Sequence, residues 1–102
     1  KSASEQLLSY LSASSFRDGL IAGIPGNIPV AHKHGEQELG TGSANKQLHD
    51  CGIVYYPDSP YLLCVMSKGD SFEKDAAAIR DISRFVYEAV DRHIQTDHLL
   101  GR

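Results

Sequence analysis

Two histidines separated by one residue, His32 and His34, stand out among the side chains whose types and spacing could do chemistry. Alternate residues of a strand share a face, so both imidazoles could point to one site, and His49 could join them as a third metal ligand. Two histidines at this spacing are weak evidence, because no His, Cys or Asp set has the spacing of a zinc finger. We predict no metal and no other cofactor, and keep a histidine-based metal site as a third hypothesis.

The two cysteines, Cys51 and Cys64, lie on strands that we expect to pair. In the register that pairs Tyr56 with Tyr61, the cysteines lie diagonal to each other. A register change of two residues would place them directly opposite, where a disulfide is possible. Two cysteines do not make a disulfide scaffold, and we favour two buried free thiols.

We expect one helix before these residues in the sequence and one after them. Ser2 and Glu5 fit a capping box, and leucines then recur at helical spacing, which predicts a helix over residues 3–14. Ser71 is a good helix cap, and the apolar stripe that follows predicts a second helix over residues 72–96.

Three strands are predicted between the helices, at residues 29–34, 51–56 and 61–67. The polar, glycine-containing stretch 35–46 is predicted to be a flexible loop, and Pro57 to Pro60 a turn that makes the last two strands antiparallel. Residues 53–56 and 61–66 are apolar without alternation, which is typical of strands buried on both faces. The helices could cover one face each, or share one face and leave the other to a missing partner.

Length, charge and composition exclude some classes of partner. The chain has 102 residues, enough for one domain, and a net charge of −3 without a clustered basic face, so we predict no nucleic-acid partner. Its longest apolar run, residues 61–66, is too short to cross a bilayer, so we predict no membrane contact. The chain starts at Lys1 and its only methionine is Met66, so we expect it to be a piece of a longer protein.

Three stretches carry a resemblance: residues 22–25 (AGIP), 29–36 (PVAHKHGE) and 49–57 (HDCGIVYYP). In order and spacing they resemble the C-terminal part of the class A β-lactamases and their penicillin-recognising relatives. Those proteins have an AGIP or AGLP turn, a strand ending in Lys-Thr-Gly or Lys-Ser-Gly, and a later strand that opens with an aspartate and runs to a proline. The resemblance covers residues 5–94. It implies an α/β (α+β) sandwich, in which N- and C-terminal helices pack on an antiparallel sheet.

The resemblance also implies site roles. Lys33 is the motif lysine, a catalytic residue that supplies positive potential for a substrate carboxylate and for proton transfers. His34, where the family has Thr or Ser, would hydrogen-bond that carboxylate, and Gly35 would let the strand approach the ligand closely. The N–H of Glu36 would be one of two oxyanion-hole donors. Lys33 and His34 point to opposite faces of an ideal strand, so they serve one site only near a strand end or a local twist.

Two catalytic motifs of that family, Ser-x-x-Lys and Ser-Asp-Asn, are expected upstream of the lysine strand. Residues 43–46 and 71–74 match Ser-x-x-Lys, but both follow that strand, so we reject them as nucleophiles. No Ser-Asp-Asn occurs. By resemblance, residues 1–102 are a single C-terminal segment of the α/β part, and the upstream catalytic portion is absent.

The implied parent is a serine hydrolase of the bacterial cell envelope or exterior. It would acylate a serine with a β-lactam or a peptidoglycan-like peptide amide and then hydrolyse the ester. This segment alone would be inactive, and its partners would be that small substrate and the missing N-terminal portion. The alternative is a non-catalytic β-lactamase-like binding module, which the replacement at His34 favours.

Overall fold

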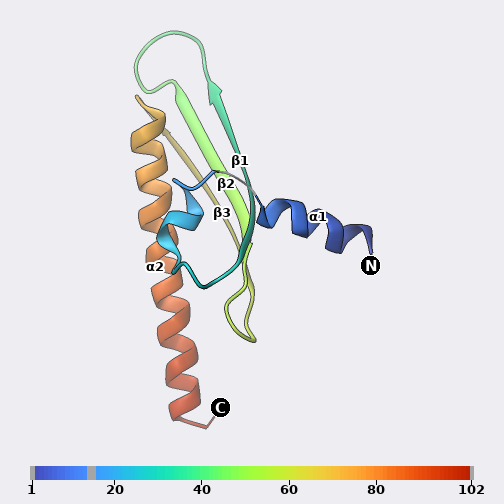
Figure 1. The fold of residues 1–102 in the computed structure, drawn as a ribbon. Helices are drawn as coiled ribbons and strands as arrows, with labels where there is room; N and C mark the ends of the chain where they lie inside the picture. The colour runs from blue at the N-terminus through green and yellow to red at the C-terminus, as the bar shows by residue number, and fades with distance from the viewer. Residues whose placement is uncertain (1, 14–15, 102) are drawn as a thin grey trace.

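The computed structural model describes residues 2–13 and 16–101. Within them the chain forms a three-stranded antiparallel sheet with helices on it, as the sequence predicts (Figure 1). In chain order the elements are α1 (Ala3–Ser12), the short 3-10 helix η1 (Leu20–Gly23), β1 (Val30–Glu38), β2 (Lys46–Val54), β3 (Tyr61–Gly69) and α2 (Phe72–Leu99).

Both α-helices begin where the sequence predicts, because a serine hydroxyl caps each first turn. Ser2 accepts a hydrogen bond from the Glu5 N–H at 3.2 Å, and Ser71 accepts one from the Lys74 N–H at 3.1 Å. The end predicted for the first helix, Ser14, lies outside the described residues. The second helix, α2, runs three residues beyond its predicted end at residue 96.

The predicted loop over residues 35–46 is wrong at its two ends, where residues 35–38 and 46 belong to strands. Strands β1 and β2 pair continuously from Val30↔Val54 to Glu38↔Lys46, so only residues 39–45 connect them. The outer half of β1 carries mostly exposed, polar side chains, which is why its composition resembles a loop. Backbone hydrogen bonds continue to its end, where the Leu39 N–H donates to the Asn45 carbonyl at 2.7 Å.

The connection between β2 and β3 is two residues longer than predicted, and this changes which residues lie opposite the two cysteines. Val54 pairs with Tyr61, so Cys51 lies directly opposite Cys64, with 4.0 Å between their Cα atoms. The two form a disulfide, so the prediction of free thiols is wrong. Because Cys51 exchanges its backbone hydrogen bonds with β1, the pair that it makes with β3 is of the closer, non-hydrogen-bonded kind.

The sheet has one helix-covered face and one open face. Helix α2 and η1 share the covered face (Figure 1). The sequence left open whether the two predicted helices take one face each or share one face, and neither arrangement is found, because α1 buries none of its residues against the sheet. The core of that face consists of Leu20, Leu48, Val65, Ala76 and Ile79. On the open face of β3, Leu62 is 72% exposed and Met66 is 66% exposed. Helix α1 contacts β1, points away from the sheet and buries none of its residues.

A tyrosine cluster joins α2 to the β2–β3 connection. Tyr56 donates a hydrogen bond to Asp91 at 2.6 Å, and its ring lies 5.7 Å from that of Tyr87. Tyr61 packs on the neighbouring apolar cluster, and its hydroxyl is buried without a partner among the described residues. Burial, with a smaller contribution from Tyr87, raises the pKa of Tyr61 to about 12.

The disulfide should contribute measurably to stability. Its cysteines are 13 residues apart, and closing a loop of this size is worth about 3 kcal/mol in the chain-entropy model. We expect the Cys51→Ser/Cys64→Ser double variant to lose about that much free energy of unfolding in a denaturant titration. A reducing agent should destabilise the wild-type chain and leave the double variant unchanged. Free thiols in the non-reduced wild-type chain would contradict the disulfide.

The raised pKa of Tyr61 predicts a loss of stability in alkali. From its ordinary pKa of 10.0 up to about 12, the folded state keeps a phenol proton that the unfolded state has lost. The free energy of unfolding should therefore fall across this window. Tyr61→Phe should make that fall smaller, whereas Tyr10→Phe should not, because Tyr10 is 67% exposed. Equal alkaline slopes in the wild-type chain and the Tyr61→Phe variant would contradict the prediction.

Candidate functional site

The candidate site lies along β1, an edge strand of the described sheet. The Tyr55 N–H donates to the Pro29 carbonyl at 3.0 Å, and the Leu39 N–H donates to the Asn45 carbonyl. These bonds place the odd-numbered residues of β1 in hydrogen-bonded pairs with β2. The even-numbered residues, including His34 and Glu36, therefore direct their backbone groups to the free edge. The Glu36 N–H is available there as a donor.

The side chain of Lys33 starts on the open face and turns to this same edge. It is exposed, and its ammonium nitrogen donates to the His34 carbonyl oxygen at 2.8 Å. Because that carbonyl points to the free edge, the lysine charge and the Glu36 N–H meet at one border of the sheet. In an ideal strand the Lys33 side chain would project from the open face, away from the edge where the Glu36 N–H lies. The flexible lysine side chain lets the ammonium reach that edge.

His34 lies on the other face, away from the Lys33 side chain. Its ring stacks on Phe16, with 4.1 Å between the ring centroids and 22° between the planes. Its Nδ1 is buried without a partner among the described residues. The sequence prediction did not include Phe16, because nothing in the local pattern shows which strand side chain it will contact.

Gly35 makes room for a neighbouring side chain. A Cβ built at Gly35 would lie 2.6 Å from both Cε1 and Nε2 of His49, so the imidazole sits directly over the glycine on the open face. His49 is therefore on the opposite face from His32 and His34, and the three imidazoles do not converge. No group of three or more His, Cys, Asp or Glu in the described part of the chain could hold a metal ion.

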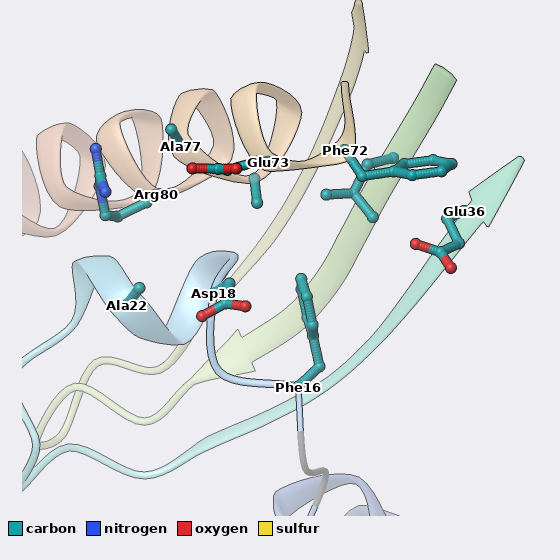
Figure 2. A pocket seen from close by; sticks show the side chains of 10 residues that line it. Phe16, Asp18, Ala22, Glu36, Phe72, Glu73, Ala77 and Arg80 are labelled. Carbon is teal, nitrogen blue, oxygen red and sulfur yellow. The ribbon is translucent and has the colours of Figure 1, made fainter. Parts of the chain in front are cut away.

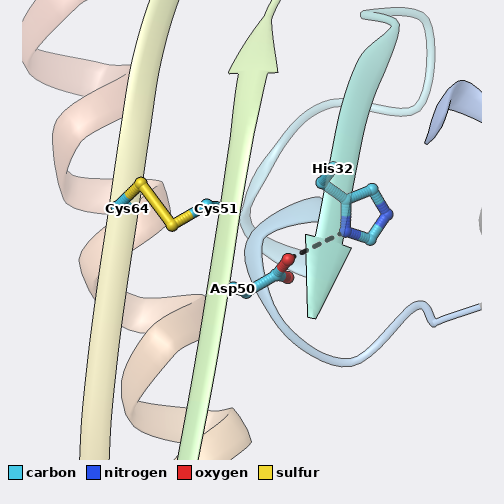
Figure 3. Close-up of a disulfide and its surroundings, with 4 residues drawn as sticks. All are labelled: His32, Asp50, Cys51 and Cys64. Atoms are coloured by element: carbon cyan, nitrogen blue, oxygen red, sulfur yellow. Dashed lines mark hydrogen bonds and ion pairs between the residues drawn. A yellow bond between two sulfur atoms is a disulfide. The ribbon is translucent and has the colours of Figure 1, made fainter. Parts of the chain in front are cut away.

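A buried carboxylate fixes β1 beneath the site. Asp50 accepts from His32 Nδ1 at 3.0 Å through one oxygen (Figure 3). Its other oxygen accepts from the Leu20 N–H at 3.0 Å. Asp50 and His32 are at most 1% exposed. Gly52 is required beside them, because a Cβ there would lie 2.6 Å from the His32 Cβ. His32, considered in the sequence as a metal ligand, is instead the partner of Asp50.

The two Ser-x-x-Lys matches have other surroundings. Ser71 is the cap of α2, and its hydroxyl oxygen accepts from the Lys74 N–H, while the Lys74 ammonium lies 3.3 Å from Asp70. Ser43 is exposed in the connection between β1 and β2. Neither serine has a lysine ammonium within hydrogen-bond distance in the described structure, which agrees with their rejection as nucleophiles.

A comparison with protein-family models identifies one family. Residues 1–90 match the model of the Beta-lactamase2 family, described as the beta-lactamase enzyme family. No curated protein matches the chain.

Solved structures give the same fold. A class A β-lactamase from Bacteroides cellulosilyticus has a TM-score of 0.72 at 23% identity, over 86% of this chain and 33% of its own. A PBP-A mutant in an acyl-enzyme complex with penicillin G has a TM-score of 0.68 at 23% identity, over 86% and 31%. A variant of a last common ancestor of Gram-negative class A β-lactamases has a TM-score of 0.70 at 26% identity, over 90% and 35%. The chain therefore spans about one third of the length of these structures.

The buried carboxylate makes the most direct prediction for this region. Asp50→Asn replaces one of the two acceptor oxygens with an NH2 group, and leaving a buried donor unsatisfied typically costs about 1–3 kcal/mol. We expect a loss of this size in the free energy of unfolding. The matched control is Asp81→Asn, which breaks an exposed pair with Arg80 and should cost less than about 1 kcal/mol. Equal losses in the two variants would show that the Asp50 contacts contribute little.

Proposed function

Because the chain belongs to the β-lactamase enzyme family, we propose that it forms one wall of the active site of a serine hydrolase. The observation that carries the proposal is the meeting of the Lys33 ammonium and the outward Glu36 N–H at the free edge of β1. A β-lactam or a peptidoglycan-like peptide amide laid along this edge would find a cation for its carboxylate. It would also find a backbone donor for the oxyanion that develops at its carbonyl.

The chemical step divides between this chain and residues outside it. A serine from elsewhere in the protein attacks the amide carbonyl, and the ester that forms is then hydrolysed. Lys33 orients the substrate through its carboxylate and favours proton transfers near the nucleophile. The Glu36 N–H stabilises the negative charge on the tetrahedral intermediate. His34 contributes its backbone carbonyl, which anchors the lysine, and not a side-chain contact to the substrate.

The partner that would bring the serine is the remainder of a longer protein. The open face supports this proposal, since Leu62 and Met66 expose apolar surface on the same face from which Lys33 arises. The outer edge of β3 also has no partner strand in the described sheet. Exposed apolar patches and free strand edges are typical of surfaces that another segment covers. Covering the open face would place that segment beside Lys33.

We propose an extracellular or cell-envelope location for the parent protein. The Cys51–Cys64 disulfide supports this, because disulfides persist in oxidising compartments and are rare in the cytosol of most organisms. Among the described residues, no helix is long and apolar enough to span a membrane.

A non-catalytic binding module is the second candidate, and one feature favours it. The space over Gly35, where the family's strand approaches its ligand, holds the His49 imidazole. A ligand at this edge would then have to displace His49 or bind beside it. In that case the fold and the edge would be kept for binding, without turnover.

The two candidates predict different kinetics for a longer protein that contains this chain. An enzyme should hydrolyse a chromogenic cephalosporin, and Lys33→Ala should lower kcat/KM by about 10²-fold, because an electrostatic group aimed at the substrate is lost. Lys68→Ala, which removes an exposed lysine of β3, should leave the rate unchanged. The 102-residue chain alone should be inactive.

Three outcomes separate the possibilities. Turnover that falls in the Lys33 variant alone supports the enzyme. Saturable β-lactam binding without turnover supports the binding module. Turnover by the 102-residue chain alone would contradict the division of the active site.

A further inference from the structure

A hollow opens on the helix-covered face, between the start of α2 and the segment that leads into η1. It has a volume of about 580 Å³, which is within the usual range for small-molecule sites. In Figure 2, Glu73 and Arg80 of α2 face Asp18 and Phe16 across the hollow, and Glu36 of β1 lies at its far end.

The inner surface of this hollow is apolar. Leu48 contributes from β2, Phe72 from the start of α2, and Phe16 from the opposite wall. Phe16 is held in place by its stack on His34, so one wall is a fixed aromatic ring. Fixed aromatic walls favour a ligand with a flat or compact apolar body, because such a body fills the space at little entropic cost.

The charges at the hollow are mainly negative. Three carboxylates line it, those of Asp18, Glu36 and Glu73. None of the three has a hydrogen bond or an ion pair with another described residue. The single cation of the lining, Arg80, is paired with Asp81 at 3.1 Å. A ligand that enters therefore meets three unpaired negative charges and one cation that is already engaged.

We propose that this hollow binds a small organic cation, an amidine or amine on an aromatic or compact apolar body. The apolar part would lie against Phe16, Leu48 and Phe72, and the cationic head would lie among the three carboxylates. The same charges disfavour a carboxylate ligand, since like charges repel. The inference does not depend on the proposed function, because the hollow lies within this chain and its binding can be measured without catalysis.

The test uses three probes of one shape on the 102-residue chain. Benzamidine is cationic, benzamide is neutral and benzoate is anionic, so their comparison isolates charge. In an NMR titration, benzamidine should shift the amide signals of Phe16, Leu48 and Ala76 along a saturable curve. It should bind at least about tenfold more tightly than benzamide, with benzoate weakest, and added salt should reduce the difference.

Two variants and one control connect the effect to the hollow. Glu36→Gln and Glu73→Gln each remove one lining carboxylate and should weaken benzamidine binding about three- to fivefold. Glu38→Gln removes a carboxylate from the same strand that does not line the hollow, and it should leave the affinity unchanged. All three changes are on exposed side chains, so the fold should be retained.

Four results would overturn the proposal. One is the absence of a saturable shift at the lining residues. Another is equal binding of benzamide or benzoate. A third is equal weakening by Glu38→Gln, which would indicate a diffuse effect of net charge. The last is a set of shifts at the same residues on dilution without probe, which would make a second copy of the chain the occupant.

Discussion

The buried carboxylate of Asp50 is the constraint on which the arrangement depends. A buried carboxyl group is stable only if its oxygens are satisfied, and here each oxygen has one partner, from His32 and from Leu20. The two donors belong to β1 and η1, and Asp50 itself belongs to β2, so one side chain fixes three elements. Satisfying this carboxylate sets the position of β1, and with it the edge where Lys33 and Glu36 meet.

Patterns local in sequence predicted the parts of the fold that local physics decides. The caps at Ser2 and Ser71 and the apolar stripe of α2 needed no knowledge of distant residues, and those helices begin as predicted. The outer half of the β1–β2 hairpin could not be predicted this way. The exposed, polar end of β1 has no apolar pattern that would mark it as a strand, and backbone pairing with β2 decides its structure.

The contacts of the candidate site divide in the same way between local and distant causes. The family resemblance suggested Lys33 and Glu36. Alternation along a strand predicted that the Lys33 and His34 side chains point to opposite faces. The stack of His34 on Phe16, the imidazole over Gly35 and the pair of His32 with Asp50 are contacts between separate elements. The prediction of free thiols failed for a related reason. The connection between β2 and β3 is two residues longer than predicted, and this register shift places Cys51 opposite Cys64.

The burial of β1 changes along its length: its first three residues are buried and its last three are exposed. Strands with few apolar contacts open locally at small free-energy cost, whereas buried segments open only with the whole fold. Lys33 directly follows the buried residues, and Glu36 is the first of the three exposed ones, although its cross-strand partner Leu48 is buried. The proposed site would therefore take its lysine from the stable part of β1 and its backbone donor from the part that opens at lower free-energy cost.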